Sequence, residues 1–420
     1  MKLLIQHATI IDPKSEFHKQ QMDILIENGI ILEIAKELTK PSDAIQFTAN
    51  NLHVSPGWCD MNANFRDPGM EYKEDLNSGM MAAAAGGFTS VAVMPGTHPP
   101  IQNKADIEFI TKRSEFHIVD LYPIGALTKD LKGKEITEMY DMHLSGAVAF
   151  SNDNYPVENP KLINIALLYT KNFGGLMYSL PRDVSLSKGG QVNESDHTTA
   201  LGMTGIPAIS ELLPINRDIC LASYTGSRIH FSAISAKESV AAIREAKKKG
   251  IGVTASVAAH QLFLDDSLLE SFDSNLKVYP PLRDKTDIEA LLEGLRDGTI
   301  DSIISKHEPE DIESKKCEFN NAAFGLIGLE TTYAVSNTTG KLDTETLINK
   351  LAISPREILD IAPASIVKGE KAELTLFDPT LEWVFTEKDI RSKSRNTPFI
   401  NKKLTGKVLG IFNNSQFHKN

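Results

Sequence analysis

The sequence is poor in cysteine and aromatic residues and has no long apolar run. Its 420 residues include three cysteines, far apart at Cys59, Cys220 and Cys317, which excludes a disulfide framework and suits a reducing cytoplasm. No apolar run approaches the roughly 20 residues of a membrane span, and the one at the N-terminus is too short for a secretory signal. Lys plus Arg number 44 against 55 Asp plus Glu, a formal charge of −11, so the chain lacks the basic surface of a nucleic-acid-binding protein. The sequence therefore predicts an acidic cytoplasmic protein that contacts neither nucleic acid nor membrane.

Both ends of the chain consist of short apolar runs separated by turn residues, a pattern typical of short β-strands. In the first 50 or so residues, two apolar runs flank Asn28-Gly29, a dipeptide typical of a two-residue hairpin turn. The segments 372–377 and 406–412 near the C-terminus are similar runs. Neither end has enough strands for a sandwich alone, so we expect the two ends to form one small β domain together.

The middle of the chain alternates between strand-like and helix-like segments. Seven or eight such cycles over roughly 300 residues predict a (β/α)₈ TIM barrel. The alternative is an open doubly wound sheet, but no phosphate loop of the form GxGxxG, or GxxxxGK followed by Ser or Thr, follows any strand. The expected strands are 88–94, 118–124, 146–150, 175–179, 228–234, 252–257 and 299–304, and the clearest expected helices are 80–85, 162–170, 236–249 and 287–296.

Several stretches, found in order along nearly the whole chain, identify a resemblance. They are the loop 56–69, the run 83–95, Gly-Gly-Gln-Val-Asn-Glu at 189–194, Leu-Gly-Met-Thr-Gly-Ile-Pro at 201–207, Tyr-Pro-Pro-Leu-Arg at 279–283, and the runs 324–331 and 392–399. Together they resemble the bacterial dihydroorotases of the amidohydrolase superfamily, of the multifunctional-complex type. The resemblance implies a TIM barrel over residues 55–365, a small β-sandwich domain from residues 1–54 and 366–420, and a homodimer.

The resemblance also implies which residues would form a metal site, and here the sequence departs from the family. Family members hydrolyse a cyclic amide with zinc, which polarises the carbonyl and lowers the pKa of bound water. The His-x-His after the first barrel strand is replaced by Asn62 and Asn64, and no His-x-His occurs anywhere in the chain. Amides carry no negative charge and are poor zinc ligands. The remaining ligand and general-base positions hold Asn152 (with Asp153 beside it), Leu180, Ala233 and Lys306. We therefore expect no zinc and no other metal cofactor.

The substrate pocket implied by the resemblance is partly retained. Arg66, which grips the substrate carboxylate in active relatives, is present, as is His307. Gly96 and Tyr279 stand where the family has asparagines that contact the substrate. Arg66 could still bind a small anion, or it could be a relic that forms an ion pair with Asp60 or Asp67. A different metal site from Asp60, Asp153 and His307 is a less favoured alternative.

Three functions remain open at this stage. The favoured one is a pseudoenzyme: a dihydroorotase homologue of pyrimidine biosynthesis that no longer hydrolyses its substrate and has a structural or regulatory role. Because non-catalytic dihydroorotase-like chains of some bacteria assemble with aspartate carbamoyltransferase, that enzyme is the expected partner. The second is a cyclic amidohydrolase with a rearranged or metal-free site for a small anionic substrate, and the third is a sensor of orotate-like anions.

Overall fold

The computed structural model describes all 420 residues, Met1 to Asn420. Eight parallel strands follow one another in spatial order, each beside the next along the chain. They are β6 (Trp58–Ala63), β7 (Phe88–Val93), β8 (Asp120–Ala126), β9 (Ala149–Ser151), β10 (Met177–Ser179), β13 (Ile229–Phe231), β14 (Val253–Ala258) and β15 (Ser302–Ile304). The last strand returns to the first. The main-chain N–H of Asn64 donates to the main-chain carbonyl of His307 at 2.9 Å, and Ala63 pairs with His307 in a parallel bridge. The predicted barrel is confirmed, and the open sheet is excluded.

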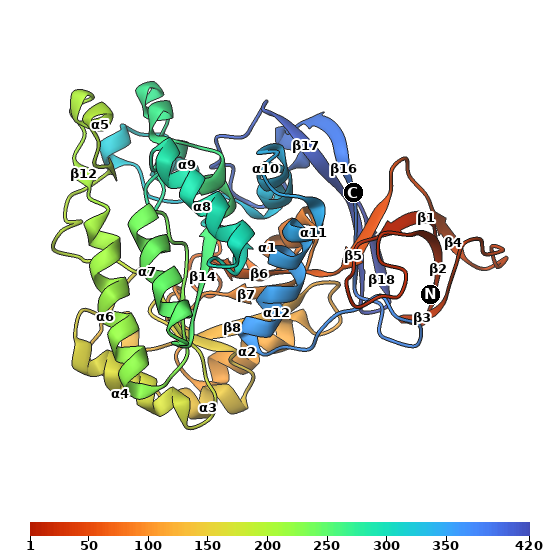
Figure 1. Ribbon diagram of the computed structural model, residues 1–420, viewed down its shortest axis with the longest axis horizontal. Helices are drawn as coiled ribbons and strands as arrows, with labels where there is room; N and C mark the ends of the chain where they lie inside the picture. The colour runs from red at the N-terminus through yellow and green to blue at the C-terminus, as the bar shows by residue number, and fades with distance from the viewer.

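Helices surround the barrel and connect its strands (Figure 1). Those of seven or more residues are α1 (Leu76–Gly86), α2 (Lys104–Ser114), α4 (Pro160–Lys171), α6 (Ile209–Thr225), α7 (Lys237–Lys248), α8 (Lys285–Asp297) and α10 (Thr332–Thr338). Shorter ones are α3 (Met139–Leu144), α5 (Asp196–Ala200), α9 (Ile312–Lys315), α11 (Thr344–Ile348) and α12 (Ser354–Leu359), and β11 (Val192–Asn193) pairs with β12 (Gly205–Ile206) outside the barrel. None of these helices combines the length and the apolar character needed to cross a membrane.

Local sequence explains where α1 begins and ends. The Asp75 carboxylate accepts a hydrogen bond from the Ser78 amide, and the Ser78 hydroxyl accepts one from the Asp75 amide, which together form a capping box. The helix ends at Gly86, where Gly87 adopts a left-handed conformation with φ of 92°, which costs glycine little. The Ala- and Met-rich segment between these signals is thereby fixed as the connection from β6 to β7.

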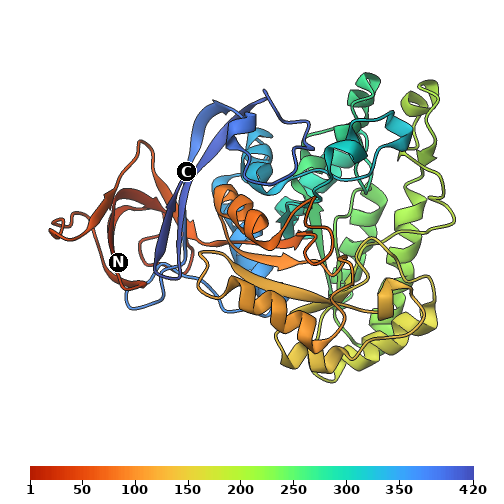
Figure 2. The ribbon, with the colours of Figure 1, turned by 180° about the vertical axis from the view of Figure 1, so that it is seen from behind.

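The two ends of the chain form a single second sheet beside the barrel, and both termini lie in it (Figure 1; Figure 2 shows the same from behind). Its strands are β1 (Lys2–Ile10), β2 (Gln21–Glu27), β3 (Ile30–Ala35), β4 (Ile45–Phe47), β5 (His53–Pro56), β16 (Leu374–Val384), β17 (Lys403–Asn413) and β18 (Gln416–Lys419). The predicted hairpin at Asn28-Gly29 joins β2 to β3, with both residues at positive φ. The ends meet where β5 pairs with β16. The small β domain built from both termini is thus confirmed.

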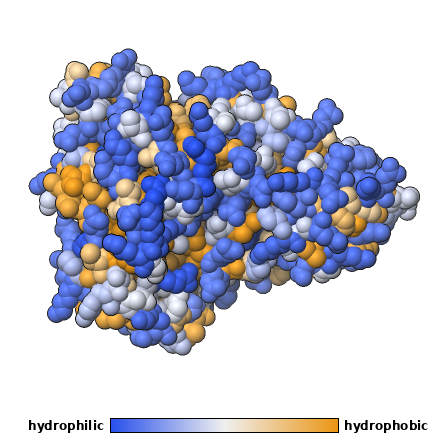
Figure 3. Space-filling view, viewed as in Figure 1, coloured by the Kyte–Doolittle hydropathy of each residue, from blue (hydrophilic) through white to orange (hydrophobic).

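The buried apolar residues form separate clusters. The largest, of 73 residues, lies between the barrel and its helices and extends to Phe377, Leu404 and Val408 of the second sheet, and another of 16 lies within that sheet. The face seen in Figure 3 is mostly hydrophilic, with apolar side chains gathered at its left edge beside α6, where Ile209 and Leu213 are exposed.

Candidate functional site

The residues singled out from the sequence lie at the carboxyl ends of the barrel strands, the end at which TIM barrels place their active sites. A cleft of about 1010 Å³ opens there. Loops that follow β6, β7, β9, β10 and β15 all contribute to its lining, among them Arg66, Gly96, Asp153, Arg182 and Glu308. Below, this end of the barrel is called the mouth.

Asn62 and Asn64 are both buried at the mouth, as their position in and just after β6 requires. The Asn62 amide nitrogen donates to the Ser232 hydroxyl at 2.8 Å. Asn62 Oδ1 and Asn64 Nδ2 are buried and have no hydrogen-bond partner. Two amides thus occupy the wall where the resemblance implies two imidazoles, and they contribute no charge.

The neighbours Asn152 and Asp153 point in different directions. Asn152 turns away from the mouth, since its Oδ1 accepts from the amide (3.0 Å) and hydroxyl (2.9 Å) of Thr128 and its amide nitrogen donates to the Leu131 carbonyl. Asp153, with a positive φ of 49°, is buried and lines the cleft. A Cβ atom at Gly96 would lie 2.0 Å from Asp153 Oδ2, so the carboxyl group fills space that any larger residue at position 96 would need. Burial raises the pKa of Asp153, although the nearby ammonium of Lys306 opposes this.

Three of the predicted site positions hold buried side chains that pack in an apolar cluster. Leu180, Ala233 and Tyr279 are buried and belong to one apolar cluster of 16 residues that runs through the barrel. Ala233 adopts a positive φ of 55°, a conformation that costs a residue with a Cβ atom. These side chains offer no metal ligand, and Tyr279 lines the cleft from within the cluster.

Lys306 brings a buried positive charge into the mouth. Its ammonium group forms an ion pair with Glu308 and donates to Asn154 Oδ1 at 3.3 Å. The Asn154 amide in turn donates to Glu308 Oε1 at 2.7 Å. Burial opposes ionisation of Glu308, but Lys306, Arg66 and these hydrogen bonds outweigh it, so the pKa of Glu308 lies below its ordinary value. The sequence reasoning missed Glu308, although the charged run 306–311 at a strand end could have indicated it.

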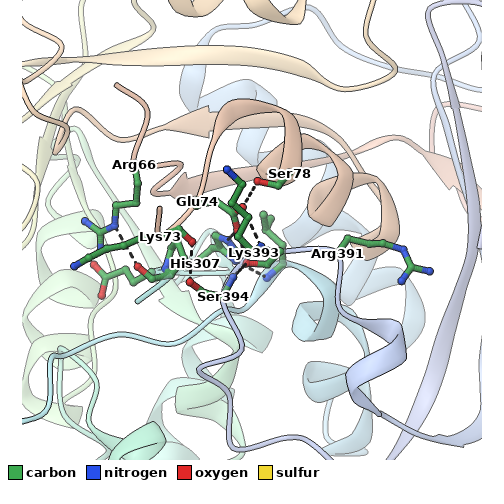
Figure 4. A network of polar contacts seen from close by, with 12 residues as sticks. Arg66, Lys73, Glu74, Ser78, His307, Arg391, Lys393 and Ser394 are labelled. Carbon is green, nitrogen blue, oxygen red and sulfur yellow. Dashed lines mark hydrogen bonds and ion pairs between the residues drawn. The ribbon is translucent and has the colours of Figure 1, made fainter. Parts of the chain in front are cut away.

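The His307 side chain lies in a buried polar network (Figure 4) and is not among the residues that line the cleft. Its Nδ1 accepts a hydrogen bond from the Gly328 amide at 3.2 Å, so Nε2 carries the proton and lies 3.4 Å from Glu74 Oε2. Burial opposes ionisation of Glu74, but hydrogen bonds from His307, Ser392 and Ser78 outweigh it and lower its pKa. Glu74 had no signal in the sequence. The histidine thus ties the last barrel strand to α1 and to the 392–394 segment.

Arg66 is engaged by a carboxylate of the protein itself. Its guanidinium lies 2.9 Å from Glu310 Oε1, and the ammonium of Lys73 pairs with the other oxygen of Glu310 (Figure 4 labels both basic residues). The expected partners Asp60 and Asp67 are therefore wrong. Asp60 instead accepts from the amide and hydroxyl of Ser305 at 2.8 and 2.6 Å.

The donor set of the mouth does not fit a zinc ion. Protein zinc sites gather three or four His, Cys, Asp or Glu side chains. No group of three or more such side chains in this chain is placed to hold a metal ion. The three residues of the alternative metal site are also dispersed. Asp60 binds Ser305, Asp153 packs against Gly96 and His307 faces Glu74.

Comparison with solved structures defines the class of fold. The chain superposes on the L-hydantoinase (dihydropyrimidinase) from Arthrobacter aurescens with a TM-score of 0.85 at 21% identity, covering 99% of this chain and 95% of that one. The dihydropyrimidinase from Brevibacillus agri NCHU1002 gives a TM-score of 0.84 at 20% identity, with the same coverage of 99% and 95%. The architecture that the chain shares with these structures is a TIM barrel with a β domain.

Sequence comparison narrows this class to one family. The family model described as Dihydro-orotase-like matches residues 52–239. A dihydroorotase from Thermoanaerobacter sp. (strain X514) is 42% identical over 413 residues, which is 97% of this chain and 95% of the relative. One from Geotalea daltonii is 40% identical over 410 residues, covering 97% and 96%. The chain belongs to the dihydroorotase family, as the sequence motifs had indicated.

Proposed function

We propose that this chain is a non-hydrolytic member of the dihydroorotase family that has lost zinc binding and serves as a structural or regulatory subunit. The observation that carries the proposal is the buried Lys306–Glu308 ion pair in the mouth. An ammonium fixed there repels a divalent cation and cannot accept a proton while it is charged. The two buried amides of Asn62 and Asn64 add no ligand charge to offset it.

Two measurements on the pure protein test this proposal. Elemental analysis should find less than one zinc per chain even after incubation with the ion, and dihydroorotate hydrolysis should stay at the level of a buffer control. The Thermoanaerobacter relative, prepared in the same way, is the positive control for both assays. Stoichiometric zinc together with turnover near that of the control would refute the proposal.

The partner of such a subunit is proposed from the resemblance to non-catalytic dihydroorotase-like chains. We propose aspartate carbamoyltransferase, with this chain as a homodimer in the assembly. Purification of the tagged chain from its native source, followed by identification of co-eluting proteins, tests this. Recovery of the chain alone at its dimer mass, from cells that contain the transferase, would count against the partnership and leave the loss of zinc unaffected.

A further inference from the structure

The charged side chains that line the cleft are balanced in number. Four are basic and four are acidic: Arg66, Lys73, Lys132 and Arg182, against Asp130, Asp153, Glu308 and Glu310. Equal numbers give no preference for a ligand of either sign by themselves. The pairing of these groups, however, is uneven.

Three of the four basic groups form ion pairs with carboxylates of the cleft. Glu310 binds both Arg66 and Lys73, and Lys132 lies 2.9 Å from Asp130. Arg182 forms no ion pair, and its only hydrogen bond uses Nε, which donates to Ser187 Oγ at 2.9 Å. Both terminal nitrogens of its guanidinium group therefore have no protein acceptor.

The Arg182 guanidinium is nevertheless held in one orientation. Its central carbon lies 4.6 Å from the centroid of the buried Tyr279 ring. Ser187, which fixes Nε, is itself buried and donates to the Asp183 carbonyl at 2.6 Å. A guanidinium restrained at Nε and on one face presents its remaining N–H groups as a planar fork, and little side-chain entropy remains to be lost on binding.

We propose that Arg182 is the anion-binding residue of the cleft and that its ligand is a small molecule carrying a carboxylate on a flat, apolar body. A carboxylate matches the fork with two parallel hydrogen bonds. A dianionic phosphate would meet stronger repulsion from Asp153 and Glu308 on the same lining. The aromatic and proline side chains of Tyr279, Phe324 and Pro99 supply apolar surface for the rest of the ligand.

This site is distinct from the Arg66 position that the sequence pointed to. Arg66 already has an internal carboxylate as its partner, so a ligand there would have to displace Glu310. Arg182 lies on the loop after β10 and needs no such exchange. Arg182 is free to bind such an anion whether or not the chain hydrolyses a substrate.

Binding of benzoate, followed by calorimetry and by the shift in melting temperature, tests the proposal. The neutral isostere benzamide controls for the apolar body, and inorganic phosphate tests the other class of anion. Wild type should bind benzoate at millimolar concentration and be stabilised by it, and should bind benzamide and phosphate at least about tenfold more weakly. R182Q should lose the benzoate response.

Two further variants keep the test decisive. R113Q removes an arginine that also lies over a ring, that of Phe109 at 5.3 Å, but is outside the cleft, and it should bind benzoate like wild type. R182K keeps the charge without the fork and should bind about tenfold more weakly than wild type; it decides the matter if R182Q does not fold. No benzoate binding by wild type, equal binding by R182K, or tighter binding of phosphate would overturn the proposal.

Discussion

Replacement of Lys306 by methionine should destabilise the protein by roughly 3–5 kcal/mol, the cost of removing one partner of a buried ion pair. The side chains of Lys306 and Glu308 are only 2% and 3% exposed. Methionine keeps the length and apolar stem of the lysine, so little packing is lost. What remains is a buried Glu308 carboxylate, beside a buried Asp153, without its main cation.

A double-mutant cycle separates this charge effect from packing. K306M, E308Q and the double variant are unfolded in urea and followed by tryptophan fluorescence, to which the fully buried Trp58 contributes. The double variant should lose clearly less than the sum of the single losses, because neither charge is then left alone. K248M removes an exposed lysine, paired with an exposed Glu245, and should cost less than about 1 kcal/mol. A loss of less than about 1 kcal/mol for K306M, or strict additivity in the cycle, would show that Lys306 and Glu308 do not depend on each other for stability.

The loss of unfolding free energy caused by K306M should also depend on pH, and it should become smaller as the pH falls. In wild type the pKa of Glu308 lies below its ordinary value of 4.5, so its contribution to stability is complete above pH 4.5 and is lost as the pH falls through the lower folded-state value. Protonation of the carboxyl groups removes the uncompensated charge from the variant. Without Lys306, burial raises the pKa of Glu308 in the variant, so the difference between wild type and K306M should begin to narrow above pH 4.5 and continue to narrow below it.

Three further predictions concern other contacts of the mouth. Gly96→Ala, whose Cβ atom would meet Asp153 Oδ2 at 2.0 Å, should cost about 1–3 kcal/mol in denaturation; it should cost less in an Asp153→Gly background, and an unchanged cost there would contradict the steric explanation. Glu310→Gln should free Arg66 and strengthen the weak phosphate binding of wild type, measured by calorimetry; no gain would show that Glu310 does not keep anions from Arg66. Burial raises the pKa of Asp60 from 3.8 to about 6, so the folded protein binds an extra proton between these values. The free energy of unfolding of wild type, minus that of Asp60→Asn, should therefore fall by up to about 3 kcal/mol as the pH rises through that range. A difference that stays constant with pH would show that the pKa of Asp60 is not raised.

The barrel could be predicted because its signals are local. The helix expected over 236–249 is α7 at Lys237–Lys248, and the strand expected over 118–124 is β8 at Asp120–Ala126. The two-residue strands β11 and β12 carry no periodicity and were not predicted. The pairing of β5 with β16 joins segments more than 300 residues apart, and no local pattern contains that register.

The sequence predicted which residues lie in the candidate site, but not which side chains they contact there. Family motifs located Arg66 and His307, whereas their partners Glu310 and Glu74 come from positions to which no motif pointed. The sequence also could not show which of the neighbours Asn152 and Asp153 faces the mouth. That choice depends on the positive φ of Asp153 and on the space beside Gly96, which are properties of the folded backbone.

The unusual residues of the mouth occur as complementary sets, in which each side chain is matched by the charge or the shape of another. Lys306 is paired with Glu308, two residues further along the same loop, and Glu310 on that loop holds Arg66 on the loop after β6. The Asp153 carboxyl occupies the space that Gly96 leaves open. Changing one member of any set alone would leave a buried charge uncompensated or create a steric clash. Installing a metal site in the mouth would therefore require several coordinated substitutions, each of which should destabilise the mouth when made alone.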